Sequence, residues 1–225
     1  MTPRSSPKNG AIALFGGAFD PIHMGHLAVA RVACRQFHLD SVHFIPSGRP
    51  PHKTEAALSP FEHRYAMVAL ACAGHRRFVP SLAEADISGP GRFFYTIDTV
   101  RRYQRQRANK QTALYFITGA DAFLQISTWK EYRALLETCD FIVAHRPGFR
   151  LDALAEVIPP DLLAGRPPRG GDIALRRTTV HLLRAVSSGV SSTEIRRRCR
   201  QGRAIRGLVA PPVGEYIDKQ ALYRG

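Results

Sequence analysis

The chain has no long apolar run and few acidic residues, and its four cysteines are widely scattered. None of its apolar stretches approaches the ~20 residues that a membrane-spanning helix needs, which argues against a membrane protein. The first ten residues are polar and lack the apolar core of a signal peptide, so we expect a flexible tail over residues 1–10. The remaining residues, 11–225, are enough for one α/β domain with a sizeable core.

Cysteine usage indicates the compartment and argues against two kinds of structural site. The cysteines lie at positions 34, 72, 139 and 199, and no two of them form a Cys-x-x-Cys pair. This spacing is typical of free thiols in a reducing cytoplasm and does not suggest disulfides or zinc ligands. We therefore expect a cytoplasmic protein.

The shortage of acids leaves the chain strongly basic. It carries 18 acidic residues against 32 lysines and arginines, a formal net charge of +14. The excess is concentrated between Arg166 and Arg206, where eleven arginines accompany two acids. Such a field attracts nucleic acid or nucleotides such as ATP, and a solvated basic face explains most individual arginines equally well. No RNA-binding motif accompanies the charge, so we expect no nucleic-acid partner.

Apolar and amphipathic segments alternate along the chain. Buried strands are predicted at residues 11–15, 41–46, 113–118 and 139–144, with a weaker one at 179–186. Helical patterns occupy residues 26–38, 60–73, 96–108, 128–137 and 192–200. This alternation predicts an α/β fold with a doubly wound parallel sheet, whose C-terminal helices pack back beside the first. Residues 146–175, rich in proline, glycine and arginine, predict a long connection with one short helix around 151–157.

The most informative segment is G-G-A-F-D-P-I-H-M-G-H, residues 16–26, between the first strand and the first helix. It is neither a dinucleotide-binding fingerprint nor a P-loop. The carboxyl end of a parallel strand is where ligands bind, and a helix N-terminus suits a phosphate. His23 and His26 can add hydrogen bonds to a reacting phosphoryl group, although either histidine alone fits a helix cap equally well. We expect Asp20 to support the turn.

A second polar segment, S-S-T-E-I-R at residues 191–196, follows the last predicted strand. Serine and threonine at a helix start can cap the helix and can also present hydroxyls to an anion. Ser191 and Glu194 already have the spacing of a capping box. Arg196, one turn into the helix, can reach an anion with its forked guanidinium. Taken alone, the segment supports capping and anion binding equally.

The H-x-G-H string resembles the signature of the nucleotidylyltransferase superfamily. The longer string around it is similar to the bacterial nicotinate-nucleotide adenylyltransferases, and the likeness extends from about Ala11 to the closing A-P-P-V-G-E-Y-I-D-K-Q-A-L-Y-R. This chain departs from the family at Ala18, where threonine or serine is usual, and at Phe94, where serine is usual. The resemblance implies a Rossmann-like nucleotidylyltransferase fold. It also implies transfer of the adenylyl group of ATP to nicotinate mononucleotide in NAD biosynthesis, releasing pyrophosphate.

The resemblance also implies residue roles. The expected catalytic residues are His23, His26 and Arg196. The expected ATP contacts are Gly16, Gly17, Phe19, His23, Gly25, His26, Gly119, Asp121, Ser192, Thr193 and Arg196. The expected contacts of nicotinate mononucleotide are Ala18, His52, Lys53, Tyr95, Thr96, Trp129 and Arg146. Mg²⁺ is the implied cofactor, held mainly by phosphates and water rather than by a protein metal site.

Other functions remain open at this stage. One is an adenylyltransferase of the same superfamily acting on nicotinamide mononucleotide or phosphopantetheine; the phosphopantetheine enzymes typically have threonine where His23 stands. Another is a non-catalytic protein that binds nucleotides or RNA through the basic C-terminal third. The sequence does not decide between the acid and the amide mononucleotide, and it leaves a homodimer open. Single residues do not settle their own roles. Without the resemblance, a single tryptophan such as Trp129 is more often a core residue, and Thr96 fits a helix cap.

Overall fold

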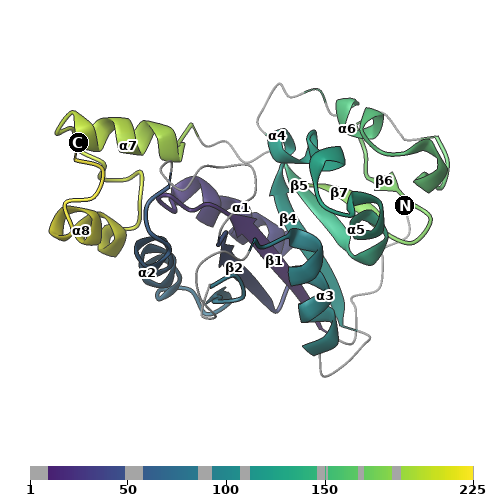
Figure 1. The fold of residues 1–225 in the computed structure, drawn as a ribbon, viewed down its shortest axis with the longest axis horizontal. Helices are drawn as coiled ribbons and strands as arrows, with labels where there is room; N and C mark the ends of the chain where they lie inside the picture. Colours follow the sequence, from purple (N-terminus) through teal and green to yellow (C-terminus); the bar gives the residue numbers. More distant parts are fainter. Residues whose placement is uncertain are drawn as a thin grey trace.

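The computed structural model describes residues 10–48, 58–85, 93–106, 112–145, 150, 152–166, 170–183 and 189–224, arranged as Figure 1 shows. Its strands are β1 (Ala11–Gly17), β2 (Ser41–Pro46), β3 (Phe78–Pro80), β4 (Ala113–Gly119), β5 (Asp140–Ala144), β6 (Ile173–Ala174) and β7 (Thr179–Leu183). Its α-helices are α1 (Met24–Gln36), α2 (Phe61–Cys72), α3 (Thr96–Gln106), α4 (Ala120–Phe123), α5 (Tyr132–Thr138), α6 (Ala153–Glu156), α7 (Ser192–Arg200) and α8 (Pro211–Lys219).

The described strands form one sheet in the order β3-β2-β1-β4-β5-β7-β6. All neighbouring pairs are parallel except β6 and β7, which are antiparallel. The doubly wound parallel sheet predicted from the sequence is therefore confirmed. Strand order reverses between β1 and β4, and in sheets of this kind the crevice at that reversal binds ligands.

Two apolar clusters cover the two faces of the sheet. In β1, Ala13 and Phe15 belong to one cluster and the intervening Leu14 belongs to the other, as expected from the period of two in a strand. The first cluster includes residues of α1, α2 and α8, and the second includes residues of α3 and α5 (Figure 1). Helices on both faces leave the carboxyl ends of the strands open to a ligand.

The C-terminal helices lie beside α1 and α2, as predicted (Figure 1). The Met24 amide donates to the Leu208 carbonyl at 2.9 Å, which ties the start of α1 to the segment before α8. His63 of α2 and the hydroxyl of Tyr216 in α8 lie 2.9 Å apart. These contacts bring the C-terminal segment to the loop that carries the paired histidines.

Several element boundaries differ from the prediction. The first helix starts at Met24 rather than at residue 26, because His23 is its N-cap. The helix predicted at 128–137 begins only at Tyr132, because Glu131 before it has a left-handed φ of 48°. A short 3₁₀ turn at Ile126–Thr128 occupies the space before it.

The sequence pattern also missed some elements and overextended others. The short strands β3 and β6 and the helix α4 were not predicted, and β6 lies inside the stretch expected to be a connection. The helix expected around 151–157 is present as α6. The strand predicted at 179–186 is described as far as Leu183. None of the helices in the described part of the chain combines the length and apolar character that crossing a membrane requires.

Candidate active site

Two adjoining cavities lie at the carboxyl ends of β1 and β4, and they share Gly16, Thr118 and Ala122. The first, of about 330 Å³, is the histidine cavity, and it is lined by Phe15, Gly16, His23, Gly25, His26, Val29, Thr118, Gly119, Ala120, Asp121, Ala122, Ala144, His145, Val190, Ser191 and Ser192. The second, of about 240 Å³, is the tryptophan cavity, and it is lined by Gly16, Gly17, Ile45, Ser47, Glu84, Phe94, Tyr95, Thr96, Phe116, Thr118, Ala122, Trp129 and Lys130.

His23 and His26 stack on one another at the N-terminus of α1. Their ring centroids lie 3.7 Å apart at an interplanar angle of 24°. The backbone N–H of His23 donates to Nδ1 of His26 at 3.2 Å. Because Nδ1 of His26 accepts this bond, the proton of the neutral ring is on Nε2, which makes Nε2–H a donor.

The environment keeps His26 neutral. Burial and the neighbouring His23 lower the pKa of His26 well below its usual value. The positive end of the α1 dipole also disfavours a charged imidazole at this position. A neutral imidazole at a helix N-terminus can donate a hydrogen bond to an oxygen on which negative charge develops, without losing its proton.

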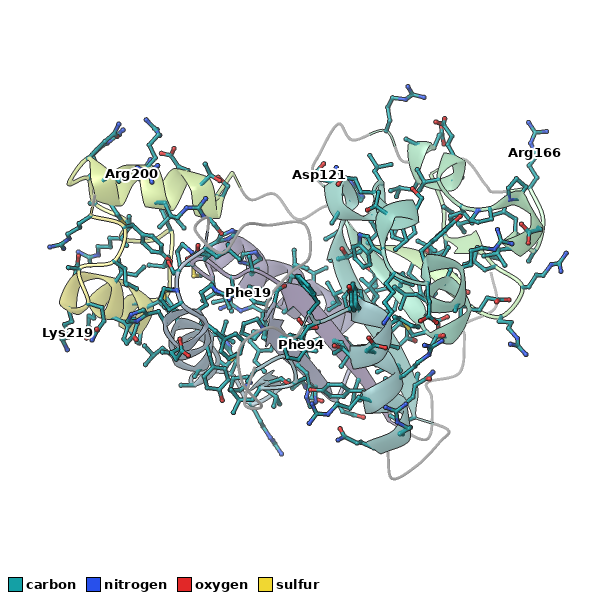
Figure 2. All side chains as sticks on the ribbon, in the orientation of Figure 1. Phe19, Phe94, Asp121, Arg166, Arg200 and Lys219 are labelled. Atoms are coloured by element: carbon teal, nitrogen blue, oxygen red, sulfur yellow. The ribbon has the colours of Figure 1, made fainter. Side chains whose placement is uncertain are left out.

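The Phe19 ring packs against the His26 ring. Its ring is buried, in a residue whose φ of 47° is unusual for a non-glycine residue. It meets the His26 ring edge to face, with centroids 5.0 Å apart and an interplanar angle of 79°. Phe19 lines neither cavity, and its contact with ATP stays a prediction. In Figure 2, Phe19 lies near the centre of the molecule.

Asp20 supports the turn, as expected, through a partner far along the chain. The hydroxyl of Tyr223 donates to Oδ1 of Asp20 at 2.6 Å, and the Ser59 amide donates to Oδ2 at 3.2 Å. Burial and this neighbouring carboxylate raise the pKa of Tyr223, so its hydroxyl keeps the proton that it donates. Asp20 is almost fully buried and lines neither cavity.

The S-S-T-E-I-R segment meets the H-x-G-H loop directly. The hydroxyl of Ser192 donates to the Pro21 carbonyl at 2.9 Å, and Nη1 of Arg196 donates to the Asp20 carbonyl at 2.6 Å. Two stretches about 170 positions apart in sequence therefore lie together, as the sequence interpretation requires. Ser192 lines the histidine cavity, whereas Thr193 and Arg196 do not.

Capping and a charged surface account for the rest of this segment. The side chain of Ser191 accepts the Glu194 amide at 3.2 Å and so caps α7. Arg197 and Arg198 both pair with Glu194, each at 2.8 Å. The structure is therefore compatible both with helix capping and with anion binding by this segment.

The tryptophan cavity brings together three of the residues predicted to contact the pyridine substrate. Tyr95, Thr96 and Trp129 all line it. The Trp129 ring meets Phe116 edge to face, with centroids 6.1 Å apart. Gly17, predicted to contact ATP, lines this cavity rather than the histidine cavity.

A buried arginine holds the loops of both cavities together. The guanidinium of Arg64 donates to the carbonyls of Ser59 at 2.8 Å, Ala18 at 3.0 Å and Ser47 at 2.7 Å, with a longer bond to Gly48 at 3.4 Å. Ala18, predicted to contact nicotinate mononucleotide, lines neither cavity and gives its carbonyl to this arginine. Burial lowers the pKa of Arg64, and nearby acids such as Asp20 oppose that effect.

Two charged residues that line the tryptophan cavity were not predicted from the sequence. Three residues that were predicted lie outside the described part of the chain. Glu84 lies in no periodic element and had no sequence signal, whereas Lys130 directly follows Trp129 and could have been found by that adjacency. The residues outside the described part are His52, Lys53 and Arg146. Gly16, Gly25, Gly119 and Asp121, for which ATP contacts are predicted, line the histidine cavity.

Comparison with known proteins agrees with this geometry. The cytidylyltransferase-like family matches residues 14–198. A protein of Moorella thermoacetica named "probable nicotinate-nucleotide adenylyltransferase" is 42% identical over 96% of this chain and 92% of its own length. A protein of Thermus thermophilus with the same name is 42% identical over 95% of this chain and 99% of its own length.

A solved structure has the same fold. The nicotinic acid mononucleotide adenylyltransferase of Plasmodium falciparum, complexed with NaAD, superposes with a TM-score of 0.71 at 19% identity, over 96% of this chain and 98% of its own. The family match and the two bacterial relatives each cover most of the chain. This chain therefore belongs to the nicotinate-nucleotide adenylyltransferases, within the cytidylyltransferase-like family.

Proposed function

We propose that this protein transfers the adenylyl group of ATP to nicotinate mononucleotide, forming nicotinate adenine dinucleotide and pyrophosphate. The observation that carries the proposal is the pair of adjoining cavities, one lined by stacked histidines and the other by Trp129 and Tyr95. A relative named for this activity is 42% identical to this chain. We therefore assign ATP to the histidine cavity and the mononucleotide to the tryptophan cavity. The reacting phosphates would meet at the shared residues, Gly16 and Thr118.

The reaction needs positioning and charge stabilisation more than acid–base chemistry. An oxygen of the mononucleotide 5′-phosphate forms a bond to the α-phosphorus of ATP. The bond from that phosphorus to the bridging oxygen breaks, and its electron pair leaves with pyrophosphate. The attacking phosphate is already ionised near neutral pH, so no general base is required. Preorganised donors that strengthen as negative charge shifts would supply most of the catalysis.

Residues of the histidine cavity would supply those donors. Nε2–H of His26 would bind an α-phosphate oxygen, with His23 beside it. Ser192 would bind the triphosphate, together with Thr193 and Arg196, as the family resemblance implies. The bond from Nη1 of Arg196 to the Asp20 carbonyl uses one of the five guanidinium donors and leaves others for a phosphate oxygen. Asp121 would accept the hydroxyls of the ATP ribose.

Mg²⁺ fits this site as an ion that would be bound through the substrate phosphates. Among the described residues, no group of three or more histidine, cysteine or acidic side chains is placed to hold a metal ion. Mg²⁺ typically keeps several waters and binds through substrate phosphates, which requires no such cluster. Bound there, it would neutralise charge on the leaving pyrophosphate.

We also propose that the protein has one nucleotidylyltransferase domain and is cytoplasmic. We assign residues 11–225 to one domain, because the elements on both faces pack on one sheet. The free thiols of Cys34, Cys72 and Cys139 are buried, and free cysteines suit a reducing cytoplasm.

A coupled pyrophosphate-release assay tests the activity. ATP and Mg²⁺ are supplied with nicotinate mononucleotide, nicotinamide mononucleotide or phosphopantetheine in separate reactions, and the dinucleotide product is identified by mass. We expect the fastest turnover with nicotinate mononucleotide. Turnover only with phosphopantetheine, or none with any acceptor, contradicts the proposal.

A further inference from the structure

The charges around the tryptophan cavity bear on a choice that the sequence leaves open. Resting on the function proposed above, this cavity receives a pyridine ring that carries either a carboxylate or a neutral amide. The two mononucleotides are otherwise the same, so a cavity that separates them needs a charge or a hydrogen-bond pattern that fits only one. Among the described residues lining the cavity, Lys130 is the only cation and Glu84 is the only acid.

The ammonium of Lys130 lies beside the start of α3. Its Nζ is 4.4 Å from the centroid of the Tyr95 ring and 3.2 Å from Oδ2 of Asp98. Tyr95 lines the cavity, whereas Asp98 does not. The two contacts hold the ammonium beside the cavity. Because an ammonium has three N–H donors, one bond to Asp98 leaves others for a ligand.

Glu84 opposes this charge only weakly. Its Oε1 accepts the Thr99 hydroxyl at 2.8 Å and its Oε2 accepts the Gly48 amide at 3.3 Å, so both oxygens already have partners in the protein. Burial raises the pKa of Glu84, while these two hydrogen bonds and the charge of Arg64 oppose that effect. Glu84 is therefore bound within the protein, whereas the ammonium of Lys130, with one bond to Asp98, has donors left for an anionic group.

The helix beside Lys130 acts in the same direction. Thr96, which lines the cavity, is the first residue of α3. The N-terminus of this helix is the positive end of its dipole, which favours a carboxylate over an amide. The start of α3 and the side chain of Lys130 therefore both lie at the cavity that Trp129 lines.

We propose that Lys130 is a specificity-determining residue, whose ammonium selects the mononucleotide bearing a pyridine carboxylate over the one bearing an amide. The ammonium donates to the carboxylate and forms a charge-assisted hydrogen bond. The amide gains no comparable charge interaction, because it is neutral. Trp129 binds the ring in either case, so the charge of Lys130 acts on the acid-to-amide ratio rather than on turnover in general.

The test compares kcat/KM for the two mononucleotides in the wild type and in Lys130→Met, with ATP saturating. Methionine keeps most of the length of the side chain and removes its charge. We expect the ratio of kcat/KM for acid over amide to fall about 10- to 100-fold, the range for losing a hydrogen bond to a charged group. The KM for ATP should not change. Lys130→Arg, which keeps the charge, should retain most of the preference.

Lys219→Met is the matched control, because it makes the same chemical change on α8, outside both cavities (labelled at the left in Figure 2). Its acid-to-amide ratio should equal that of the wild type. An unchanged ratio in Lys130→Met, or an equal loss for both substrates, overturns the inference while leaving the proposed function intact. A wild-type protein that turns over neither mononucleotide overturns both. If Lys130→Met does not fold, Lys130→Gln decides by the same criteria.

Discussion

The hydroxyl of Tyr223 donates a 2.6 Å hydrogen bond to Oδ1 of Asp20, across 203 positions of sequence. The same loop gives its Pro21 carbonyl to Ser192 and its Asp20 carbonyl to Arg196. The loop that presents the paired histidines is therefore held by the C-terminal segment as well as by its own strand and helix. Residues that touch no substrate can act on catalysis through this connection.

Tyr223→Phe tests whether the connection positions the loop. The variant removes one hydrogen bond to a charged group, so we expect a loss of about 1.5–3 kcal/mol in the free energy of unfolding. We also expect kcat to fall by about tenfold, because small displacements of catalytic groups are costly. Chemical denaturation and steady-state kinetics measure the two effects.

Tyr216→Phe is the matched control. Its hydroxyl lies 2.9 Å from His63 and also joins the C-terminal segment to the rest of the molecule, but its partner is on α2 rather than on the 16–26 loop. This variant should lose about 0.5–1.5 kcal/mol of stability, with kcat unchanged. Equal kcat values in Tyr223→Phe and the wild type would show that the Asp20 contact is only structural.

His26→Ala should lower kcat by roughly 10²–10³-fold, the scale for removing one preorganised donor to a developing charge. The fold should survive, because the ring packs at the edge of a cavity. His38→Asn, at an exposed position near the end of the same helix, provides a control that should keep full activity. Near-normal turnover in His26→Ala would refute the role assigned to this ring.

The tautomer of His26 gives a second observable. Burial and the neighbouring His23 lower the pKa of His26, so the ring should stay neutral as the pH falls through 6.5. Nitrogen-15 NMR of the imidazole should show a protonated Nε2 and an unprotonated Nδ1 at about pH 6, just below the usual histidine pKa. A ring that titrates near 6.5 would contradict the hydrogen bond from the His23 amide.

Trp129→Ala should act mainly on the pyridine substrate. Stacking of a base on an aromatic ring contributes about 1–3 kcal/mol, so we expect KM for nicotinate mononucleotide to rise about 10- to 100-fold. KM for ATP should change little, because Trp129 does not line the histidine cavity. Trp129→Phe should recover part of the loss, and an effect confined to ATP would rule out stacking on the pyridine.

Arg64→Lys should destabilise the protein although it keeps the charge. Lysine cannot reproduce the planar fork that serves the Ser59, Ala18 and Ser47 carbonyls. Leaving one or two of these buried acceptors without partners should cost about 2–4 kcal/mol of unfolding free energy. A melting temperature equal to that of the wild type would show that water replaces these bonds freely.

The sequence patterns predicted the fold wherever elements are long and regular. Alternating strands and helices are visible because the strands predicted from the sequence each span at least five residues, and this alternation indicates a parallel sheet. The order of the strands came only from the structure. The strands β3 and β6 have three and two residues, too few to show any period. The late start of α5 depends on one left-handed residue, Glu131, whose conformation no pattern indicates.

The site was predictable only where its residues lie in contiguous motifs. His23, His26, Ser192 and Trp129 line the two cavities, and each was predicted from a local string together with the family resemblance. Arg64 was not, because its partners are carbonyls of loops brought together only by the sheet. Tyr223 was missed for the same reason, since nothing near it in sequence indicates Asp20 as its partner.

His181 on β7, which lines neither cavity, should make the stability of the protein depend on pH. Its Nδ1 lies 2.6 Å from Asp172, and its Nε2 lies 3.9 Å from Asp140. Burial alone would lower the pKa of His181, but the hydrogen bond to Asp172 and the charges of both carboxylates outweigh burial and raise the pKa above 6.5. The folded state therefore binds this proton more tightly than the unfolded state.

The direction of the pH effect on stability follows from the higher pKa of His181 in the folded state. The stability from protonated His181 is fully present below about pH 6.5, the unfolded value, and is lost as the pH rises through the raised folded value. Other groups also titrate over this range, so the variant His181→Gln serves as the reference. We expect the difference in melting temperature between wild type and His181→Gln to be largest at about pH 6 and to shrink towards about pH 9. A difference that stays constant with pH would mean that His181 is neutral in the folded protein.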